Sequence, residues 1–285
     1  EIMPSLVGSE MCIRDSTSTS NRDHFYIVDA KTLYYENSAV VGANLSGLTI
    51  LNEQYGLVTG DGIRRIDLKS LNNVRIKNER LLCFYNSIIY NGKVLSNDTY
   101  KDESKVKYYD VNELIAAKEG EAPAVTELDI IQKQKINFVL AKDGNVYTLE
   151  SADNGCNIVK IKNDFTLEKV FANFQPAKGP YHSSPTIGMV ASETENIIYL
   201  VSTDGAIFKY ILGDSDSLKA PFIAAESGVS ITAPLQLNQQ SGELYVTYTE
   251  ERKDESKIVV YSKDGKVLHT VDCGESVPSQ ILFNN

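Results

Sequence analysis

The 285-residue sequence predicts an all-β fold that is assembled from repeats. From residue 24 onward, short apolar stretches are separated by Gly, Asn, Asp and Lys-Asp-Gly turns, which is the pattern of short strands. No long stretch carries the apolar periodicity of a helix, and the best helical candidate is the short segment 111–118. A turn motif also recurs along the chain, about once every 45 residues.

The recurring motif joins the end of one strand to the start of the next. It reads Val-Asp-Ala-Lys-Thr-Leu at residues 28–33 and Ile-Asp-Leu-Lys-Ser-Leu at residues 66–71. The Asp can cap the turn with its own side chain before the chain enters another strand. Weaker copies begin at Tyr109, Ile161, Tyr210 and Tyr261.

Three further strands accompany most copies of the motif. One strand precedes the motif, at residues 56–58, 93–95, 145–147, 198–200 and 244–246. Another follows it, at residues 73–76, 125–128, 167–171, 221–224 and 267–271. A fourth lies before the first of these, as at residues 136–140 and 185–189. Four short strands in a period of about 45 residues are the signature of a β-propeller.

Six four-stranded blades can be counted, and seven are possible because the first period begins directly at its third strand, residues 25–28. The segment 277–283 reads as an extra strand that enters the first blade and closes the ring, which would hide the sheet edges. We therefore expect a single propeller domain over residues 24–285, truncated at its N-terminus, after a polar tail at residues 17–23.

Residues 1–16 differ from the rest of the chain. They have neither the basic start nor the apolar core of a signal peptide. Residues 6–15 resemble a transposase-based sequencing adapter that has been translated in frame. We expect residues 1–16 to be an adapter-derived artefact joined to a metagenomic fragment, the alternative being a natural leader, and we exclude them from the fold.

Three segments carry a resemblance to a known family. These are the motif at residues 28–33, Lys-Asp-Gly-Lys-Val-Leu at 263–268, and Val-Pro-Ser-Gln-Ile-Leu-Phe at 277–283. They resemble YVTN-type propellers and, more narrowly, an uncharacterised-domain subfamily of secreted surface lipoproteins from Gram-negative anaerobes. The resemblance covers residues 24–285 but departs from the family in lacking a Leu-Asn-Glu-Gly opening strand and in counting six blades where seven are usual. It implies an extracellular or outer-membrane location, with the signal and lipid anchor lost from this fragment.

Charge and hydropathy exclude several classes of partner. The net charge is -10 and the pI is about 4.9, which argues against nucleic acid and against anionic membrane surfaces. No apolar run approaches the roughly 18 residues of a membrane span. We expect membrane attachment only through the lost lipid anchor, and we expect a monomer.

The sequence offers no clear catalytic or metal-binding motif. His24, His182 and His269 have no neighbour at metal-ligand spacing, and the cysteines form no Cys-x-x-Cys. Asp214 and Asp216 share a loop that could attract calcium, but it lacks the Gly and distal Glu of a helix-loop-helix site, and a solvated turn is the preferred interpretation. Neither a nucleophile elbow nor a phosphate loop is present. We therefore predict no catalytic residue, no metal and no cofactor.

The predicted ligand site is one face of the propeller. This face carries the loops that join each blade to the next and the loops between second and third strands, and the resemblance places ligands there. The richest loop is 173–184, whose Tyr and His offer flat faces and hydrogen bonds that suit sugars or planar cofactors, although its Pro and Gly residues could simply shape a crossover. The candidate residues are Tyr181, His182, Ser183 and Lys178 in this loop, and Asn44, Arg80, Lys135, Thr232 and Glu275 in others.

We expect recognition by these loops on a rigid ring rather than covalent chemistry. The partner would be a small molecule, a glycan or a surface protein, and the resemblance suggests a role in nutrient uptake with glycans or corrinoids among the ligands. One alternative is a hydrolase or lyase of the lactonase kind with a channel metal; another is a scaffold that binds protein only. Tyr147, Tyr199 and Tyr245 recur at equivalent positions of the repeat, which favours packing between blades.

Overall fold

A computed structural model describes most of the chain beyond its first 22 residues. The described residues are 23–28, 35–42, 47–59, 62–77, 87–97, 104–121, 123–132, 137–177, 188–250, 255–275, 281 and 283. The chain divides into two compact units, residues 1–129 and 130–285, each of which is described by itself.

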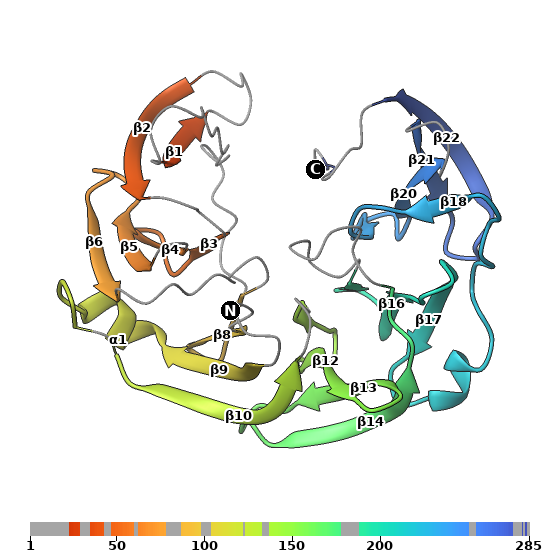
Figure 1. The fold of residues 1–285 in the computed structure, drawn as a ribbon, viewed down its shortest axis with the longest axis horizontal. Coiled ribbons are helices and arrows are strands. Elements are labelled where there is room, and N and C mark those ends of the chain that lie inside the picture. Colours follow the sequence, from red (N-terminus) through yellow and green to blue (C-terminus); the bar gives the residue numbers. More distant parts are fainter. Residues whose placement is uncertain are drawn as a thin grey trace. The chain divides into compact units, whose positions relative to one another are not determined.

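The first unit holds three antiparallel sheets in which strands pair in chain order (Figure 1). The first sheet is β1 (Asp23–Val28) and β2 (Tyr35–Gly42). The second contains β3 (Gly47–Ile50), β4 (Tyr55–Thr59), β5 (Ile63–Asp67) and β6 (Asn73–Lys77). The third contains β7 (Ile88–Tyr90), β8 (Lys93–Asn97), β9 (Ser104–Asp110) and β10 (Val125–Gln132), with helix α1 (Val111–Ala116) between the last two; the last three residues of β10 fall in the second unit.

The second unit continues the same pattern with three more sheets (Figure 1). The fourth sheet contains β11 (Val139–Leu140), β12 (Val146–Ala152), β13 (Gly155–Ile161) and β14 (Leu167–Phe174). The fifth contains β15 (Met189–Ala191), β16 (Ile197–Val201) and β17 (Ile207–Ile211), followed by the 3-10 helix η1 (Ser215–Leu218). The sixth contains β18 (Val229–Ile231), β19 (Gln236–Leu237), β20 (Leu244–Glu250), β21 (Ser256–Tyr261) and β22 (Val267–Gly274).

These sheets are the blades of a β-propeller, so the predicted fold class is confirmed. The described residues form six sheets, the number of blades counted in the sequence. The recurring motif begins in or at the end of the third strand of its sheet in the five later blades, at Ile66, Tyr109, Ile161, Tyr210 and Tyr261. The predicted helix over 111–118 is α1.

The turn chemistry of the motif is also as predicted. Asp67 Oδ1 accepts hydrogen bonds from the Lys69 and Ser70 amides at 3.1 and 2.7 Å. These bonds, with those from Gln54 and the Ser70 hydroxyl, lower the pKa of Asp67 to about 2. Asp110 plays the same part at the next copy, where it caps α1 through the Asn112 and Glu113 amides.

One predicted strand is wrong. Residues 221–224 are expected to be the outer strand of the fifth sheet, but only Ile223 forms a bridge, to Ile207. Pro221 has no amide hydrogen to donate, and the preceding chain is taken up by η1, so a regular ladder does not form. The repeat pattern also does not predict β18, which pairs with the far end of β20. The predicted inner strand at 185–189 begins at Met189, residues 185–187 lying outside the described residues.

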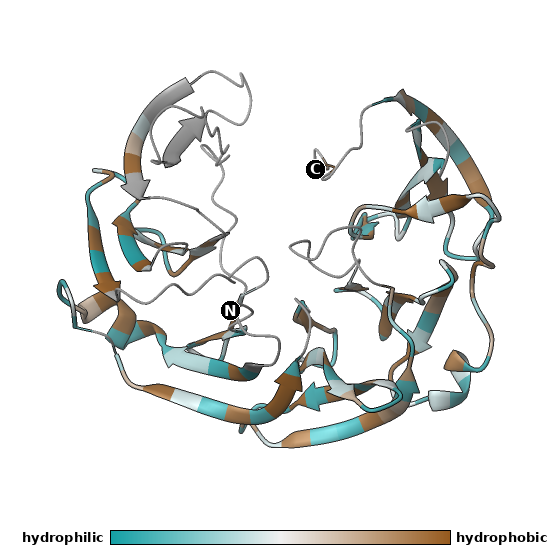
Figure 2. Cartoon of the chain, in the orientation of Figure 1, coloured by the Kyte–Doolittle hydropathy of each residue, from teal (hydrophilic) through white to brown (hydrophobic). Residues whose placement is uncertain are grey.

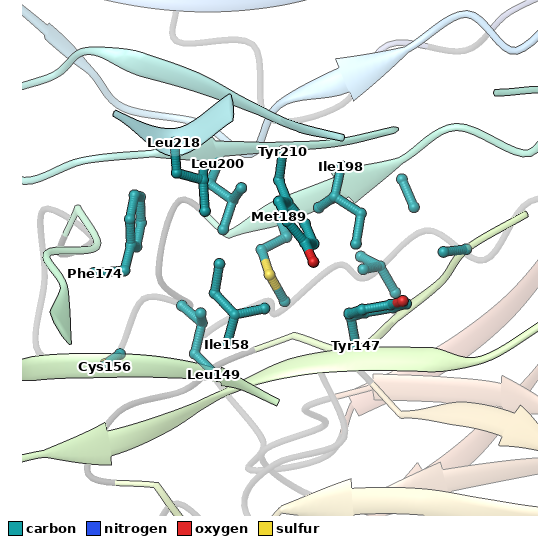
Figure 3. Close-up of a cluster of buried hydrophobic side chains, with 13 residues drawn as sticks. Tyr147, Leu149, Cys156, Ile158, Phe174, Met189, Ile198, Leu200, Tyr210 and Leu218 are labelled. Carbon is teal, nitrogen blue, oxygen red and sulfur yellow. The ribbon is translucent and has the colours of Figure 1, made fainter. Parts of the chain in front are cut away.

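The core lies between successive sheets. Apolar residues gather in the inner strands (Figure 2), and all five residues of β16 are buried, so these sheets present apolar side chains on both faces. In the second unit, Tyr147, Leu149 and Ile158 of the fourth sheet pack against Ile198 and Tyr210 of the fifth (Figure 3). A second cluster joins the fifth sheet to the sixth. A third joins the second sheet to the third in the first unit.

Candidate functional site

Three loops of the second unit begin at one structurally equivalent point. That point is the backbone carbonyl two residues after each of the recurring tyrosines Tyr147, Tyr199 and Tyr245. The Leu149 carbonyl accepts a hydrogen bond from Gln132 Nε2 at 2.9 Å, and the Val201 carbonyl accepts one from the Ala177 amide at 2.8 Å. The Thr247 carbonyl accepts one from the Thr232 amide at 3.3 Å.

Beyond this point the chain enters the innermost strand of the blade that carries the carbonyl, so the first two loops join one sheet to the next and the third lies within the sixth sheet. These strands are β11, β15 and β19, and β15 contacts the other two. The loops between are residues 133–138, 178–188 and 233–235. They therefore start and end on a fixed frame, while their lengths and sequences differ.

Six of the candidate residues predicted from sequence belong to these three loops or stand next to them. Lys135 belongs to the first loop, Thr232 stands at the start of the third, and the second loop contains Lys178, Tyr181, His182 and Ser183. Of the nine candidates, seven lie outside the described residues: Tyr181, His182, Ser183, Lys178, Asn44, Arg80 and Lys135.

The two described candidates occupy different settings. Thr232 is half-buried, and its Oγ1 lies 2.8 Å from Thr249 Oγ1, so this hydroxyl helps to hold the loop to β20. Glu275 is exposed in the turn that follows β22. The hydrogen bonds of the described residues do not connect these two side chains.

Asn137 is a positioning residue that the sequence interpretation missed. Its Nδ2 donates to the Met189 carbonyl at 2.6 Å, and its Oδ1 accepts from the Met189 amide at 3.0 Å. The neighbouring Gly188 has φ +72°, and a Cβ there would lie 2.9 Å from Asn137 Oδ1. Asn137 thus ties the end of one loop to the end of the next. Its position just before an apolar inner strand was the only signal in the sequence.

The other end of the 178–188 loop is also fixed. Gln175 Nε2 donates to the Asn154 carbonyl at 2.6 Å, while the Thr203 amide donates to the Gln175 carbonyl at 2.9 Å. Thr203 Oγ1 lies 3.0 Å from the Pro176 carbonyl. Both ends of this loop are therefore anchored to strands of the fourth and fifth sheets.

A half-buried polar cluster lies at the other end of the fourth sheet. Asp143 Oδ2 accepts from Tyr147 Oη and pairs with Lys160 Nζ, both at 2.8 Å. Burial alone would raise the pKa of Asp143, but the Lys160 ammonium, the Tyr147 hydroxyl and the Asn145 amide together hold it below its usual value. Burial, followed by the bond to Asp143, raises the pKa of Tyr147 well above its usual value. The cluster fixes a buried tyrosine and offers no reactive group.

The described part of the chain contains no cluster of side chains that could bind a metal ion. No group of three or more His, Cys, Asp or Glu side chains gathers among the described residues. Asp214 caps η1 through the Asp216 amide, and Asp216 pairs with Lys219 at 2.9 Å, so this loop forms a capped turn.

The thiols and the helices add two smaller findings. Cys156 is a buried free thiol whose pKa is raised to about 11 by burial, and Cys273 is a half-exposed free thiol; Cys83 lies outside the described residues. Within the described ranges, neither helix is long and apolar enough to cross a membrane.

Among solved structures, one similar protein has high sequence identity to this chain and others have low identity. A quinonprotein alcohol dehydrogenase-like protein from Bacteroides thetaiotaomicron VPI-5482 is 92% identical, with a TM-score of 0.88; the match covers 95% of this chain and 68% of that one. A functionally unknown protein from Desulfotomaculum acetoxidans DSM 771 is 12% identical, with a TM-score of 0.55 and coverage of 94% and 87%. Puromycin hydrolase is 13% identical, with a TM-score of 0.55 and coverage of 91% and 43%. The last two share the fold alone.

Sequence comparison gives the family. No curated protein matches the chain. The domain of unknown function DUF5074 matches residues 17–284, which is nearly the whole chain. The chain therefore belongs to the DUF5074 family.

Proposed function

We propose that this protein is a binding propeller of the cell surface, which recognises its ligand through the loops that leave the inner ends of its blades. One observation carries the proposal: three loops of different length and sequence depart from equivalent carbonyls, those of Leu149, Val201 and Thr247. Variable loops on an invariant frame are the usual construction of a binding surface.

The composition of the loops favours a ligand with negative charge or many hydroxyl groups. Residues 133–138 and 178–188 contain three lysines, one histidine and one tyrosine but no carboxylate. This is the reverse of the chain as a whole, whose net charge is -10. An ammonium group binds carboxylates and hydroxyls, and an aromatic ring packs on the flat face of a sugar or a planar cofactor.

The resemblance to surface lipoproteins supports the location and the role. A propeller that assists uptake across the outer membrane would meet acidic glycans or corrinoids, and both fit the loop chemistry. Recovery of the coding sequence upstream of residue 17 tests the location. We expect an export signal that ends in a lipid-modified cysteine, and a reading frame without any export signal would contradict a surface location.

Calorimetric titration of the purified chain tests the binding. The probes are an oligogalacturonate, a neutral galacto-oligosaccharide of the same length, and cyanocobalamin. We expect Tyr181→Ala and Lys135→Ala each to weaken binding of the preferred probe at least about ten-fold. The matched control is Lys162→Ala, which removes a lysine paired with Glu168 in the turn at the opposite end of the fourth sheet and should leave binding unchanged.

Two results would contradict the proposal. One is binding that the loop variants leave intact, which would place the ligand elsewhere. The other is conversion of a bound probe into products, which mass spectrometry of the titrated mixture would detect and which would favour a hydrolase or lyase.

A further inference from the structure

A threonine stands in the core of the fourth sheet where the two following sheets have apolar residues. Strand pairing defines the equivalent positions, since each residue directly follows the recurring tyrosine that pairs with the innermost strand. The residues are Thr148, Leu200 and Val246, and their exposed fractions are 0%, 1% and 0%. Burying a hydroxyl costs free energy unless it is hydrogen-bonded. The fourth sheet therefore holds a polar group that packing alone does not require.

The Thr148 hydroxyl is bonded on both sides. Thr148 Oγ1 accepts a hydrogen bond from Gln132 Nε2 at 2.9 Å and donates one to the Asn137 carbonyl at 3.1 Å. Gln132 and Asn137 are the described residues that flank the segment 133–136. One buried hydroxyl therefore joins the two ends of the segment that carries Lys133 and Lys135.

Gln132 takes a place that the backbone takes in the other two sheets. Its Nε2 also donates to the Leu149 carbonyl, whereas the equivalent carbonyls of the fifth and sixth sheets accept hydrogen bonds from backbone amides. A long side chain loses more rotamer freedom than a short one when it is fixed in one position, so a second contact helps to hold it. Thr148 supplies such a contact, and Gln132 is buried almost completely.

The chain of hydrogen bonds continues from the first loop to the second. The Asn137 side chain bonds both polar backbone groups of Met189, donating to the carbonyl at 2.6 Å and accepting from the amide at 3.0 Å. Met189 is the first residue of β15, and its side chain is buried between the fourth and fifth sheets (Figure 3). Thr148 bonds the backbone of Asn137, and the side chain of Asn137 bonds Met189, so Thr148 can act on Met189 through one intermediate residue.

We infer that Thr148 is a positioning residue, whose hydroxyl holds the loops 133–138 and 178–188 as one unit. It fixes the Asn137 carbonyl and thereby the direction of the Asn137 side chain, which fixes the end of the second loop. Its role in binding rests on the proposed function, because these loops carry the lysines, the histidine and the tyrosine that would contact an acidic or hydroxyl-rich ligand. The positioning of Met189 does not rest on that function.

Hydrogen exchange of the free protein tests the positioning. Thr148→Val removes the hydroxyl, keeps the shape of the side chain and reproduces the residue of the sixth sheet, Val246. We expect the Met189 amide to exchange at least about ten-fold faster in this variant. The Ser192 amide, which donates to the Ile197 carbonyl at 2.9 Å in the same sheet, is the internal control and should change less than about two-fold.

Two further variants complete the exchange experiment. Thr148→Ser keeps the hydroxyl and should preserve slow exchange of the Met189 amide. Thr148→Ala provides the same comparison if the Thr148→Val protein does not fold. Unchanged exchange at Met189 in the variants that lack the hydroxyl would overturn the inference. Equal acceleration at Met189 and Ser192 would also overturn it, because the whole sheet would then have loosened.

Calorimetric titration of the same variants with the preferred probe tests the role in binding. We expect Thr148→Val to weaken binding at least about five-fold and Thr148→Ser to change it less than about two-fold. Unchanged binding by a Thr148→Val protein with fast exchange at Met189 would overturn the role in binding. If no probe binds the unsubstituted chain, the proposed function fails, and the exchange rates alone decide whether Thr148 positions Met189.

Discussion

The fourth and sixth sheets pair their second and third strands in the same register but have very different environments. Ile158 of the fourth sheet is fully buried beneath the fifth, whereas Ile258, at the same position of the sixth, is half-buried. The local sequences are equally apolar, so the difference comes from the neighbour and not from the strand. In repeat architectures, stability is close to a sum of the stabilities of single repeats and of the interfaces between neighbours. The fifth sheet covers Ile158, whereas Ile258 is only partly covered.

The polar contacts of the two sheets also differ with burial. In the fourth sheet the Tyr147 hydroxyl is buried and bonds to Asp143, which Lys160 also holds. In the sixth sheet Tyr245 reaches Glu243 at 3.3 Å and is half-exposed, and Val260 stands where the fourth sheet has Lys160. A buried hydroxyl needs a dedicated acceptor, while a half-exposed one can bond to water.

The largest difference should appear in thiol reactivity. Cys156 is buried in the fourth sheet with a pKa raised to about 11, so at pH 8 only about one thiol in a thousand is ionised. Cys273 is half-exposed on β22. We expect iodoacetamide to label Cys273 at least about a hundred-fold faster than Cys156, read by peptide mass spectrometry. Similar rates would mean that the fourth sheet opens as readily as the edge of the sixth.

The next largest effect concerns the two isoleucines. Ile158→Ala should lower the free energy of unfolding by about 2–5 kcal/mol, because it leaves a cavity between two sheets. Ile258→Ala should cost about 1 kcal/mol or less, because solvent already reaches this side chain and can fill the space. Urea denaturation of both variants measures the difference. Equal losses would show that the face of the sixth sheet is as well packed as that of the fourth.

Sequence reasoning predicted the blades because their signals are local. A strand that ends in an Asp-capped turn is determined within a few residues, and Asp67 and Asp110 form their turns as expected. The strand expected at 221–224 failed because its pairing depended on η1 and on Ile207, neither of which the segment itself encodes.

The site was harder to predict for the same physical reason. The loops could be found by counting strands, but the residue that ties two of them together, Asn137, acts on Met189, 52 residues away. Likewise Tyr245 matches Tyr147 and Tyr199 in the repeat, yet only the latter two are fully buried. A contact between repeats depends on which repeat is next, and one blade's sequence does not contain that information.

A smaller difference in stability is expected between the Tyr147→Phe and Tyr245→Phe variants. Tyr147→Phe removes a hydrogen bond from a buried hydroxyl and leaves Asp143 paired with Lys160, so we expect a loss of about 1 kcal/mol. Tyr245→Phe removes a longer bond at a half-exposed site and should cost only a few tenths of that. Thermal unfolding of both variants at neutral pH provides the measurement. A larger loss from Tyr245→Phe than from Tyr147→Phe would show that the half-exposed hydroxyl contributes more to stability than the buried one.

The smallest effect is a pH dependence confined to the fourth sheet. The pKa of Asp143 is lower in the folded protein than the usual 3.8, so the carboxylate stabilises the fold above that pH, and this contribution is lost as the pH falls through the folded pKa. Asp143→Asn should therefore lower the melting temperature at pH 7 by about 2 °C, and the gap to the unsubstituted protein should close below about pH 4. Asp153→Asn, at an exposed turn of the same sheet, is the control. If the difference in melting temperature persisted unchanged at pH 3, the Asp143→Asn substitution would act by disturbing the packing of Tyr147, and the charge of Asp143 would contribute little. The buried tyrosine, and not the ion pair of Asp143, would then be the reason for the difference between the two sheets.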